Sequence, residues 1–329
     1  MTWLGLYEQA LGAEAAAGYY NRNVGVPTPE GKVNVRIPLA AADAMDVRLW
    51  PEEQVLACIS PYVGRVPELR HVSEHPRFQV HHFIEGRVLD AFSPRGSSVP
   101  AHVLTDIVAL LERLVRVPQE KAPALPPDWP VSGDSPGFGR VLSGLTDRIH
   151  RKHLAEYREV FAGFGIPEEP LAVVEPLWDG LTSRPFALLH ADLHRKNMIV
   201  RDATTWFLDW ELALWGDPLY EFGIHLHKMD YPLDQRAELT RQWRERLPAE
   251  STTGPLADLD LYLAHERIKS AIVDTVRYSQ QLGTASPAQH DFLVTRLAGK
   301  LNAARPLWGS SPDLTPDRVA AALTPWSER

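Results

Sequence analysis

The sequence of 329 residues has little cysteine and no long apolar run. Its single cysteine, Cys58, excludes an internal disulfide and a zinc site built from several cysteines. No stretch of eighteen apolar residues occurs, and the first twenty residues lack a basic segment followed by an apolar one. We therefore expect neither a membrane span nor a signal peptide, and we expect a cytoplasmic protein.

Positive charge is also in short supply. Asp and Glu number 42 and Lys and Arg number 34, which gives a net charge of −8. This balance argues against nucleic acid as the main partner and is weakly consistent with a cationic substrate. Hydrophobic residues make up 44% of the chain, which is enough to bury a large core in two lobes. The sequence leaves open whether the protein is a monomer or a homodimer.

Most of the residue types that carry chemistry occur between Leu188 and Gly223. The polar loop HADLHRKN, residues 190–197, lies between the apolar runs Phe186 to Leu189 and Met198 to Val200. This pattern predicts a loop between two short strands. A turn-like segment then leads into a further apolar run that ends at Asp209. The two hairpins therefore bring together a carboxylate, an amide and a second carboxylate.

That set of side chains matches the needs of phosphoryl transfer. One carboxylate, Asp192, can orient a hydroxyl nucleophile and accept its proton. The amide of Asn197 and the carboxylate of Asp209 offer the oxygen ligands that Mg²⁺ prefers when it holds nucleotide phosphates. The protein itself has little covalent chemistry to perform.

The spacing is also specific: His-x-Asp, then Asn five residues after the Asp, then Asp-Trp-Glu twelve residues after the Asn. With Gly-Asp-Pro at 216–218 and Glu-Phe-Gly at 221–223, it resembles the aminoglycoside phosphotransferase and choline kinase-like family. The resemblance implies the protein-kinase-like fold and a kinase that uses ATP or GTP with Mg²⁺. It assigns Asp192 as catalytic base, His190 as support of the loop, and Asn197 and Asp209 as magnesium ligands.

Three positions depart from the family pattern or leave it open. Ala191 stands where a Gly is usual, and Glu221 stands where an Asp is usual. An Ala adopts a positive φ less freely than a Gly does. His194 follows Asp192 by two residues, where some kinase-like enzymes place a Lys near the transferred phosphate. We expect His194, or one of the two cations that follow it at 195 and 196, to supply that positive charge.

The N-terminal region predicts the small lobe of an α+β, bilobal fold, with a nucleotide-binding lobe at 1–85 and a large, mostly helical catalytic and substrate-binding lobe at 86–329. A helix is expected at 3–18, two antiparallel strands at 19–26 and 33–38 around a turn at 27–32, and a strand at 77–86 that runs into the hinge. No Gly-x-Gly-x-x-Gly motif occurs, so the backbone amides around Asn21 and Asn23 are expected to cover the phosphates. By resemblance, the hinge residues His81, His82 and Phe83 contact the nucleotide base.

The resemblance places the phosphate-contacting cation at Arg36, where a Lys is usual. A helix predicted at 51–62 carries Glu52 on the same face as Val55, Leu56 and Ile59. We expect Glu52 to form an ion pair with Arg36, and Glu53 is the competing candidate. Ordinary matching of acids to the helix dipole would explain either residue without any function.

The remainder of the chain is predicted to be helical at 99–116, 141–163, 171–181, 220–228, 233–245, 256–282 and 287–304. Acidic and histidine side chains beyond the magnesium site are candidates for the acceptor pocket. The candidates are Glu211, Glu221, His225, Asp230 and Glu266.

The function that the resemblance favours is a small-molecule kinase that phosphorylates a hydroxyl of an antibiotic, either an aminoglycoside or a nucleoside- or sugar-containing one, and so confers resistance. A metabolite kinase for a choline-like or sugar acceptor is an alternative. Two other classes stay open. His190, Asp192 and His194 occupy every second position of the loop, and two further histidines follow at 225 and 227. These side chains could form a metal cluster, which would make the protein a metal-dependent hydrolase. An inactive kinase-fold binding protein is the other, although all three key polar residues are present.

Overall fold

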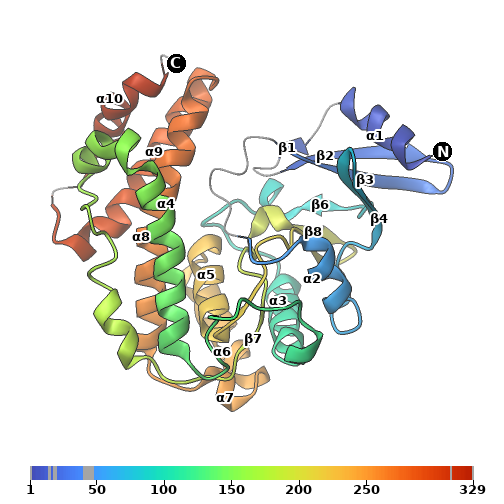
Figure 1. Ribbon diagram of the computed structural model, residues 1–329, viewed down its shortest axis with the longest axis horizontal. Helices are drawn as coiled ribbons and strands as arrows, with labels where there is room; N and C mark the ends of the chain where they lie inside the picture. Colours follow the sequence, from blue (N-terminus) through green and yellow to red (C-terminus); the bar gives the residue numbers. More distant parts are fainter. Residues whose placement is uncertain (1, 14–15, 18–20, 40–47, 312, 328–329) are drawn as a thin grey trace. The chain divides into compact units, whose positions relative to one another are not determined.

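The computed structural model describes residues 2–13, 16–17, 21–39, 48–311 and 313–327, and Figure 1 labels its elements. The chain divides into two compact units. The first contains Met1–Pro127 and Pro185–Thr252, and the second contains Asp128–Arg184 and Thr253–Arg329. Within the described residues, no helix is both long and apolar enough to cross a membrane. The predicted functional division at residue 85 stays a prediction.

A five-stranded antiparallel sheet begins the first unit, and it contains the predicted hairpin. The connection within that hairpin is shorter than predicted, because the register pairs Thr28 with Gly31. Gly31 has a φ of +127°, a backbone conformation that favours glycine. In spatial order the strands are β1 (Ala16–Ala17), β2 (Asn21–Thr28), β3 (Gly31–Pro38), β5 (Arg77–His82) and β4 (Leu69–Glu74).

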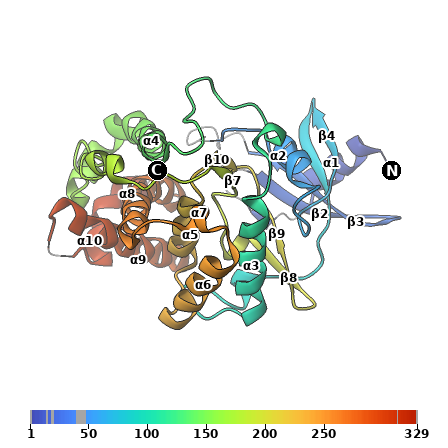
Figure 2. The same ribbon diagram turned by 90° about the horizontal axis from the view of Figure 1, so that it is seen from below.

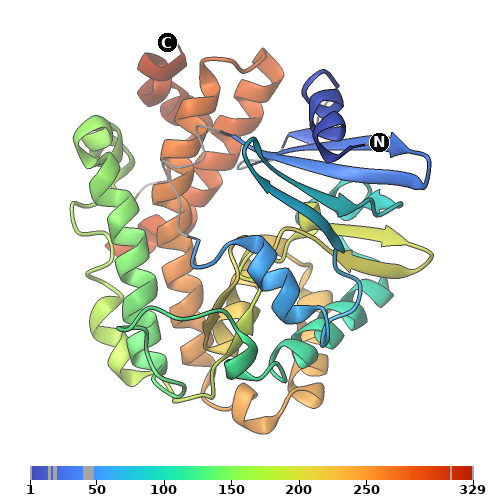
Figure 3. The same ribbon diagram turned by 45° about the vertical axis from the view of Figure 1, so that its right-hand side comes forward.

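One face of this sheet is apolar and is covered by helix α1 (Trp3–Leu11), as Figure 3 shows. The helix ends at Leu11, with Gly12 as its C-cap, before the predicted boundary at residue 18. Its buried residues, Leu6 and Ala10, pack against valines of β2 and β3 and against Phe78 and Val80 of β5. Because side chains alternate across a strand, Asn34 and Arg36 of β3 lie on the opposite face. The sheet therefore buries one side and presents polar groups on the other.

Helix α2 (Glu52–Ile59) follows Pro51, whose fixed φ suits the start of a helix. The helix buries Val55, Leu56 and Ile59, as the spacing predicted, and it also buries Glu52. A carboxylate is costly to bury unless a partner compensates its charge. That partner is Arg36 of β3.

The central segment forms the predicted strand–loop–strand. Strand β7 (Ala187–Leu189) pairs with β10 (Leu214–Gly216), and both are fully buried. Strand β8 (Met198–Arg201) lies between β6 (Arg87–Val88) and β9 (Thr204–Phe207). The polar loop runs from the end of β7 to the start of β8, and Asp209 follows β9.

Helices complete the first unit. Helix α3 (Ala101–Leu114) packs beside α6 (Leu233–Arg246), as Figure 2 shows, and buries the apolar residues that its periodicity predicted. Helix α5 (Pro218–Met229) packs against β7 and against α7 (Ala249–Thr252). Short 3-10 helices occur at Leu89–Ala91, Gln119–Lys121 and Arg195–Asn197.

The second unit is helical. Helix α4 (Ser135–Phe164) begins at the N-cap Asp134, whose Oδ1 accepts from the Gly137 N–H, and ends at Gly165 in the left-handed conformation. It lies beside α8 (Leu256–Leu282), which also packs against α9 (Pro287–Ala304) (Figure 1). The remaining elements are α10 (Pro316–Ser327) and 3-10 helices at Glu175–Gly180 and Arg305–Trp308.

One predicted element was wrong and two elements were missed. The helix expected at 171–181 is a series of turns that ends in the 3-10 helix Glu175–Gly180, because Pro176 lacks an N–H and its ring would clash inside an α-helix. Strand β4 was not predicted, although it pairs along β5. Helix α10 was also missed.

Candidate active site

The loop after β7 is tied to the following hairpin by His190. This side chain is fully buried, and burial lowers its pKa to about 4, so the ring is neutral. Its Nε2 donates to the carbonyl of Leu208 at 3.0 Å, which leaves Nδ1 to accept from the backbone N–H of Asp192 at 3.3 Å. The contacts are those of a support for the loop.

One face of helix α5 packs against the same loop and binds it through side chains. Glu221 and His225 lie four residues apart, and Lys228 lies three further on, so all three side chains project to one side. The Oε2 of Glu221 accepts from the Ala191 N–H at 2.7 Å, and the Nδ1 of His225 donates to the Leu193 carbonyl at 2.9 Å. Lys228 contacts the carboxylate of Asp192. We call Glu221, His225 and Lys228 the α5 face.

These contacts correct two predictions. Glu221 and His225 were expected to touch an acceptor, but both are buried and bound to the backbone of the loop. The second nitrogen of His225 accepts from the hydroxyl of Tyr231 at 3.0 Å, and burial lowers the pKa of His225 to about 4. The neutral ring therefore has no free polar edge. Both residues support the loop and lack access to a ligand.

Asp192 is held on both of its carboxylate oxygens. Oδ2 accepts from the Asn197 amide at 3.0 Å, while Oδ1 contacts Lys228 and lies 3.5 Å from the Nε2 of His194. Burial alone would raise the pKa of Asp192, but the charges of Lys228 and His194 outweigh it and hold the pKa well below its usual range. The side chain is 17% exposed, so a hydroxyl can still reach it.

The cations within the loop do not share one role. Arg195 is buried and donates to the carbonyls of Ser93, Ser97 and Met229, so its guanidinium is committed to backbone oxygens. Lys196 is exposed. Of the three residues expected to supply a cation near the transferred phosphate, only His194 lies beside Asp192, and Lys228 of α5 contacts the same carboxylate. Its position 36 residues downstream hid it from sequence reasoning.

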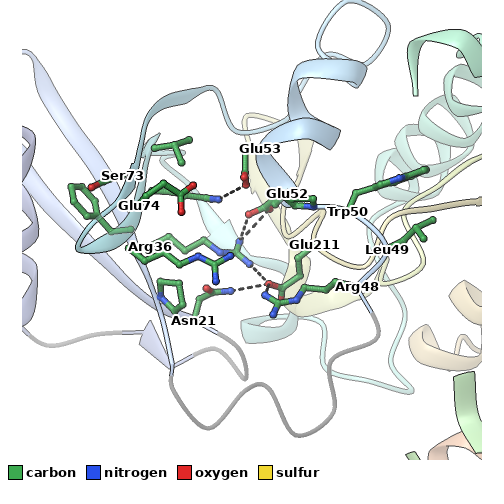
Figure 4. A pocket seen from close by; sticks show the side chains of 16 residues that line it. Asn21, Arg36, Arg48, Leu49, Trp50, Glu52, Glu53, Ser73, Glu74 and Glu211 are labelled. Carbon is green, nitrogen blue, oxygen red and sulfur yellow. Dashed lines mark hydrogen bonds and ion pairs between the residues drawn. The ribbon is translucent and has the colours of Figure 1, made fainter. Parts of the chain in front are cut away.

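Arg36 lies among three carboxylates, as Figure 4 shows for two of them. Its Nη1 is 3.2 Å from Glu52, and its Nη2 is 2.5 Å from Asp209 and 3.0 Å from Glu211. The predicted pair with Glu52 is thereby confirmed. Glu53, the competing candidate, accepts from Gln79 at 2.9 Å.

The surroundings of Arg36 explain the charges. Burial would lower the pKa of the guanidinium, but the three carboxylates raise it overall, so Arg36 stays charged. Burial and the charge of Asp209 raise the pKa of Glu211 to about 7. Glu211 also accepts from the amide of Asn21 at 2.9 Å. Glu211 was expected to contact the acceptor, but it forms an ion pair with Arg36. It also borders a polar cavity of about 300 Å³ (Figure 4).

Asn197 and Asp209 were expected to hold magnesium, and their free oxygens fit that ion. The Asn197 amide nitrogen donates to the carbonyl and the carboxylate of Asp192, which directs its Oδ1 elsewhere. Asp209 is 30% exposed and meets Arg36 through one oxygen only. Because Mg²⁺ commonly uses one or two protein ligands and completes its shell with phosphate and water, these two oxygens suffice. The assignment remains a prediction.

The predicted nucleotide contacts are changed by the strand pairing. Asn21 and Asn23 lie inside β2, paired with β3, so their amides cannot form a phosphate-covering loop. Residues 18–20, which connect β1 to β2, lie outside the described part of the chain. The side chain of Asn23 accepts from Asn34 at 3.2 Å.

The hinge predictions are likewise altered in detail. The N–H of His82 donates to the Glu68 carbonyl at 2.8 Å, which removes it as a donor to a base. His81 is buried, and burial together with the charge of Arg36 lowers its pKa to about 3. The ring of Phe83 lies 4.0 Å from the ammonium of Lys32. Base contact by residues 81–83 stays a prediction.

The last two acceptor candidates, Asp230 and Glu266, are each paired with a cation. Asp230 ends α5 with a φ of +52°, and its exposed carboxylate is 3.6 Å from Arg95. Glu266 belongs to α8 in the second unit, where it is buried and paired with Lys269 at 2.6 Å. That pairing gives Glu266 a role inside its own helical unit.

Comparison with known proteins identifies the chain. A model described as the phosphotransferase enzyme family matches residues 12–256. The chain belongs to that family. No curated protein matches the sequence as a relative.

Solved structures show the same fold in other phosphotransferases. The choline kinase LicA from Streptococcus pneumoniae has a TM-score of 0.57 at 14% identity. The match covers 90% of this chain and 93% of LicA. A macrolide 2'-phosphotransferase type I has a TM-score of 0.56 at 17% identity, with coverages of 91% and 96%. APH(2")-IIa, in its gentamicin complex, has a TM-score of 0.56 at 12% identity, with coverages of 92% and 98%. At these identities the likeness establishes the kinase-like fold.

In this phosphotransferase, Glu221 should make stability depend on pH. Burial raises its pKa to about 7 from an ordinary value of 4.5. Between these values the folded protein keeps a proton that the unfolded chain has released, so stability falls as pH rises, by about 3 kcal/mol in all. E221Q should therefore gain stability over the wild type as pH rises from 5 to 8, which urea unfolding at several pH values measures.

The exposed Glu159 of α4 offers a matched control. E159Q should change the free energy of unfolding equally at pH 5 and pH 8. If E221Q also differed from the wild type by a constant amount, Glu221 would not be the titrating group.

The ion pair between Arg36 and Glu52 should appear as coupling in this phosphotransferase. Removing one partner leaves a buried charge, which typically costs about 3–5 kcal/mol. R36M and E52Q should each destabilise the fold, while the double variant should lose clearly less than the sum of the two. Denaturant unfolding of the four proteins measures this, and strictly additive losses would contradict a direct pair.

Proposed function

We propose that this protein is a small-molecule kinase that transfers the γ-phosphoryl group of ATP or GTP to a hydroxyl of an antibiotic. The observation that carries the proposal is the arrangement around Asp192. Its carboxylate is accessible, oriented by Asn197 and Lys228, and placed on a loop that His190 ties to the strand end bearing Asp209. Family membership supports the class of reaction.

In the proposed reaction, the acceptor oxygen forms a bond to the γ-phosphorus. The bond from that phosphorus to the bridging oxygen breaks, and its electron pair stays on the nucleoside diphosphate. The hydroxyl proton passes to Asp192 as the new bond forms. The carboxylate thus aligns the nucleophile, and most of the catalysis comes from position and charge.

Asn197 and Asp209 are the residues that would hold magnesium, which when bound offsets negative charge on the phosphate oxygens. Arg36 is proposed to hold the phosphates that are not transferred. Its contact with Asp209 at 2.5 Å keeps the guanidinium beside the metal-ligating carboxylate. Glu52 and Glu211 then fix the head group of Arg36.

Donor and acceptor are supported more coarsely. LicA, which shares the fold, is known in complex with AMP, so we propose an adenine nucleotide as the first donor to test. The antibiotic acceptor is supported by the macrolide phosphotransferase and the gentamicin complex among the similar structures. Resistance to that antibiotic would follow from its phosphorylation.

The test is phosphate transfer from ATP and, in parallel, GTP with Mg²⁺. Aminoglycosides, macrolides, nucleoside antibiotics, choline and ethanolamine are assayed as acceptors by the mass increase of the product. A phosphorylated antibiotic is the expected result. Phosphorylation of choline or ethanolamine would show that the acceptor is a metabolite and not an antibiotic. Absence of any binding of a magnesium nucleotide would refute the proposed kinase activity.

A further inference from the structure

Lys228 is the one lysine or arginine whose charged group contacts Asp192 among the described residues. It donates to Oδ1 of that carboxylate and lies 3.4 Å from the carbonyl of Ala191. The residue comes from α5, two helical turns beyond Glu221, which binds the N–H of the same Ala191. Helix α5 therefore binds the loop at both backbone groups of Ala191 and at the carboxylate of Asp192.

Other nearby cations are committed to different partners. Arg195 is used by three backbone carbonyls, and Arg36 is used by three carboxylates. Lys32 lies over the ring of Phe83. The position two residues after Asp192 holds His194, whose Nδ1 accepts from the Lys196 N–H at 3.2 Å and whose Nε2 is 3.5 Å from Asp192. Among the lysines and arginines near the loop, Lys228 is therefore the one whose ammonium contacts the Asp192 carboxylate in the part of the chain that the structure describes.

We propose that Lys228, from α5, both positions Asp192 and supplies the cation of the transfer site. This proposal rests on the kinase function proposed above. Lys228 fixes Oδ1 of Asp192, so that the carboxylate presents its remaining surface to the acceptor hydroxyl. An ammonium has three hydrogens, and two contacts leave one for an oxygen bound beside Asp192.

The burial of Lys228 is suited to this task. Its side chain is 24% exposed, so it is desolvated enough for a strong charge interaction and is still accessible from solvent. A donor that is already in place needs no reorganisation when negative charge develops in the transition state. An ion pair with a purely structural purpose needs no such access.

The first test is steady-state kinetics of acceptor phosphorylation in K228M and K228R. Removing one preorganised donor typically lowers kcat by about 10²–10³-fold, and we expect K228M to do so while KM for ATP changes less than about threefold. K228R, which keeps the charge, should recover part of the loss. K152M, at an exposed lysine of α4, should behave as the wild type.

Chemical rescue separates positioning from folding. In K228A, ethylammonium should restore part of kcat because it brings back a charged N–H donor. Tetramethylammonium carries the same charge without an N–H and should restore nothing. Thermal unfolding of each variant shows whether it is folded. The proposal would be overturned if K228M kept kcat within threefold of the wild type. It would also be overturned if the two ammonium ions restored kcat of K228A to the same extent.

A binding measurement tests Lys228 even if no acceptor is turned over. Mg·ADP with fluoroaluminate mimics the phosphoryl group in transit, and transition-state mimics bind more tightly than ground-state ligands. Calorimetry should show this gain over Mg·ADP in the wild type and in K152M, and a loss of at least about tenfold in K228M. An undiminished gain in K228M would refute the role of Lys228, whereas absence of acceptor turnover in the wild type would refute only the proposed acceptor.

Discussion

Replacement of Asp192 by Asn is expected to lower kcat by about 10³-fold, because general acid–base catalysis by a positioned group contributes roughly 10²–10⁴-fold. The side chain keeps its volume but loses the charge that accepts the hydroxyl proton. Asn197 and Lys228 lose their carboxylate partner as well. Turnover of the identified acceptor measures the change.

Nucleotide binding should separate the role of Asp192 from a general loss of structure. D192N should bind Mg·ATP within a few-fold of the wild type by titration calorimetry, because the proposed phosphate and metal contacts lie at other residues. Asp202, exposed in the turn between β8 and β9, offers a control. D202N should keep full turnover. Near-wild-type turnover by D192N on the same acceptor would remove Asp192 from its assigned role.

Replacement of Asp209 by Asn is also expected to lower kcat strongly, but through weaker binding of the magnesium ion. Loss of the charge on this proposed magnesium ligand should lower kcat by roughly 10²-fold or more, since a bound metal would stabilise charge on the transferring group. Unlike D192N, this variant should also weaken binding of Mg·ATP. Calorimetry with and without Mg²⁺ distinguishes the two, because binding of metal-free ATP should change little.

The backbone at Asp209 makes Asn the informative replacement. Its φ is +67°, a region that Asn and Asp tolerate better than other residues with a side chain. The amide oxygen can still accept from Arg36. D202N is again a matched control, because Asp202 has a φ of +49°. If D209N bound Mg·ATP as tightly as the wild type, Asp209 would hold Arg36 and no metal.

The candidate site could be predicted because its key residues lie close together in sequence. His190, Asp192 and Asn197 share one loop, and Asp209 follows after one hairpin. Local strand and turn patterns are therefore enough to place them in one region. The pair of Arg36 and Glu52 was also readable, because a strand and the next helix were predicted with their facing sides.

Other features needed the packing of distant segments. Helical spacing put Glu221, His225 and Lys228 on one side of α5, but it did not say what that side faces. The structure places it against the catalytic loop, which converts two expected acceptor contacts into supports and adds Lys228 beside Asp192. Likewise, only the sheet register shows that Asn21 and Asn23 lie in a paired strand.

The sequence by itself determined the family, the kinase-like fold and the candidate catalytic and metal-binding side chains, because these depend on residue type and short-range spacing. Apart from the predicted pair of Arg36 with Glu52, tertiary structure alone decided which charges meet in the site. The three carboxylates around Arg36 and the ammonium beside Asp192 come from segments up to 175 positions apart, as with Arg36 and Glu211. Charge interactions act over a few ångströms in space, and no local pattern encodes such distances.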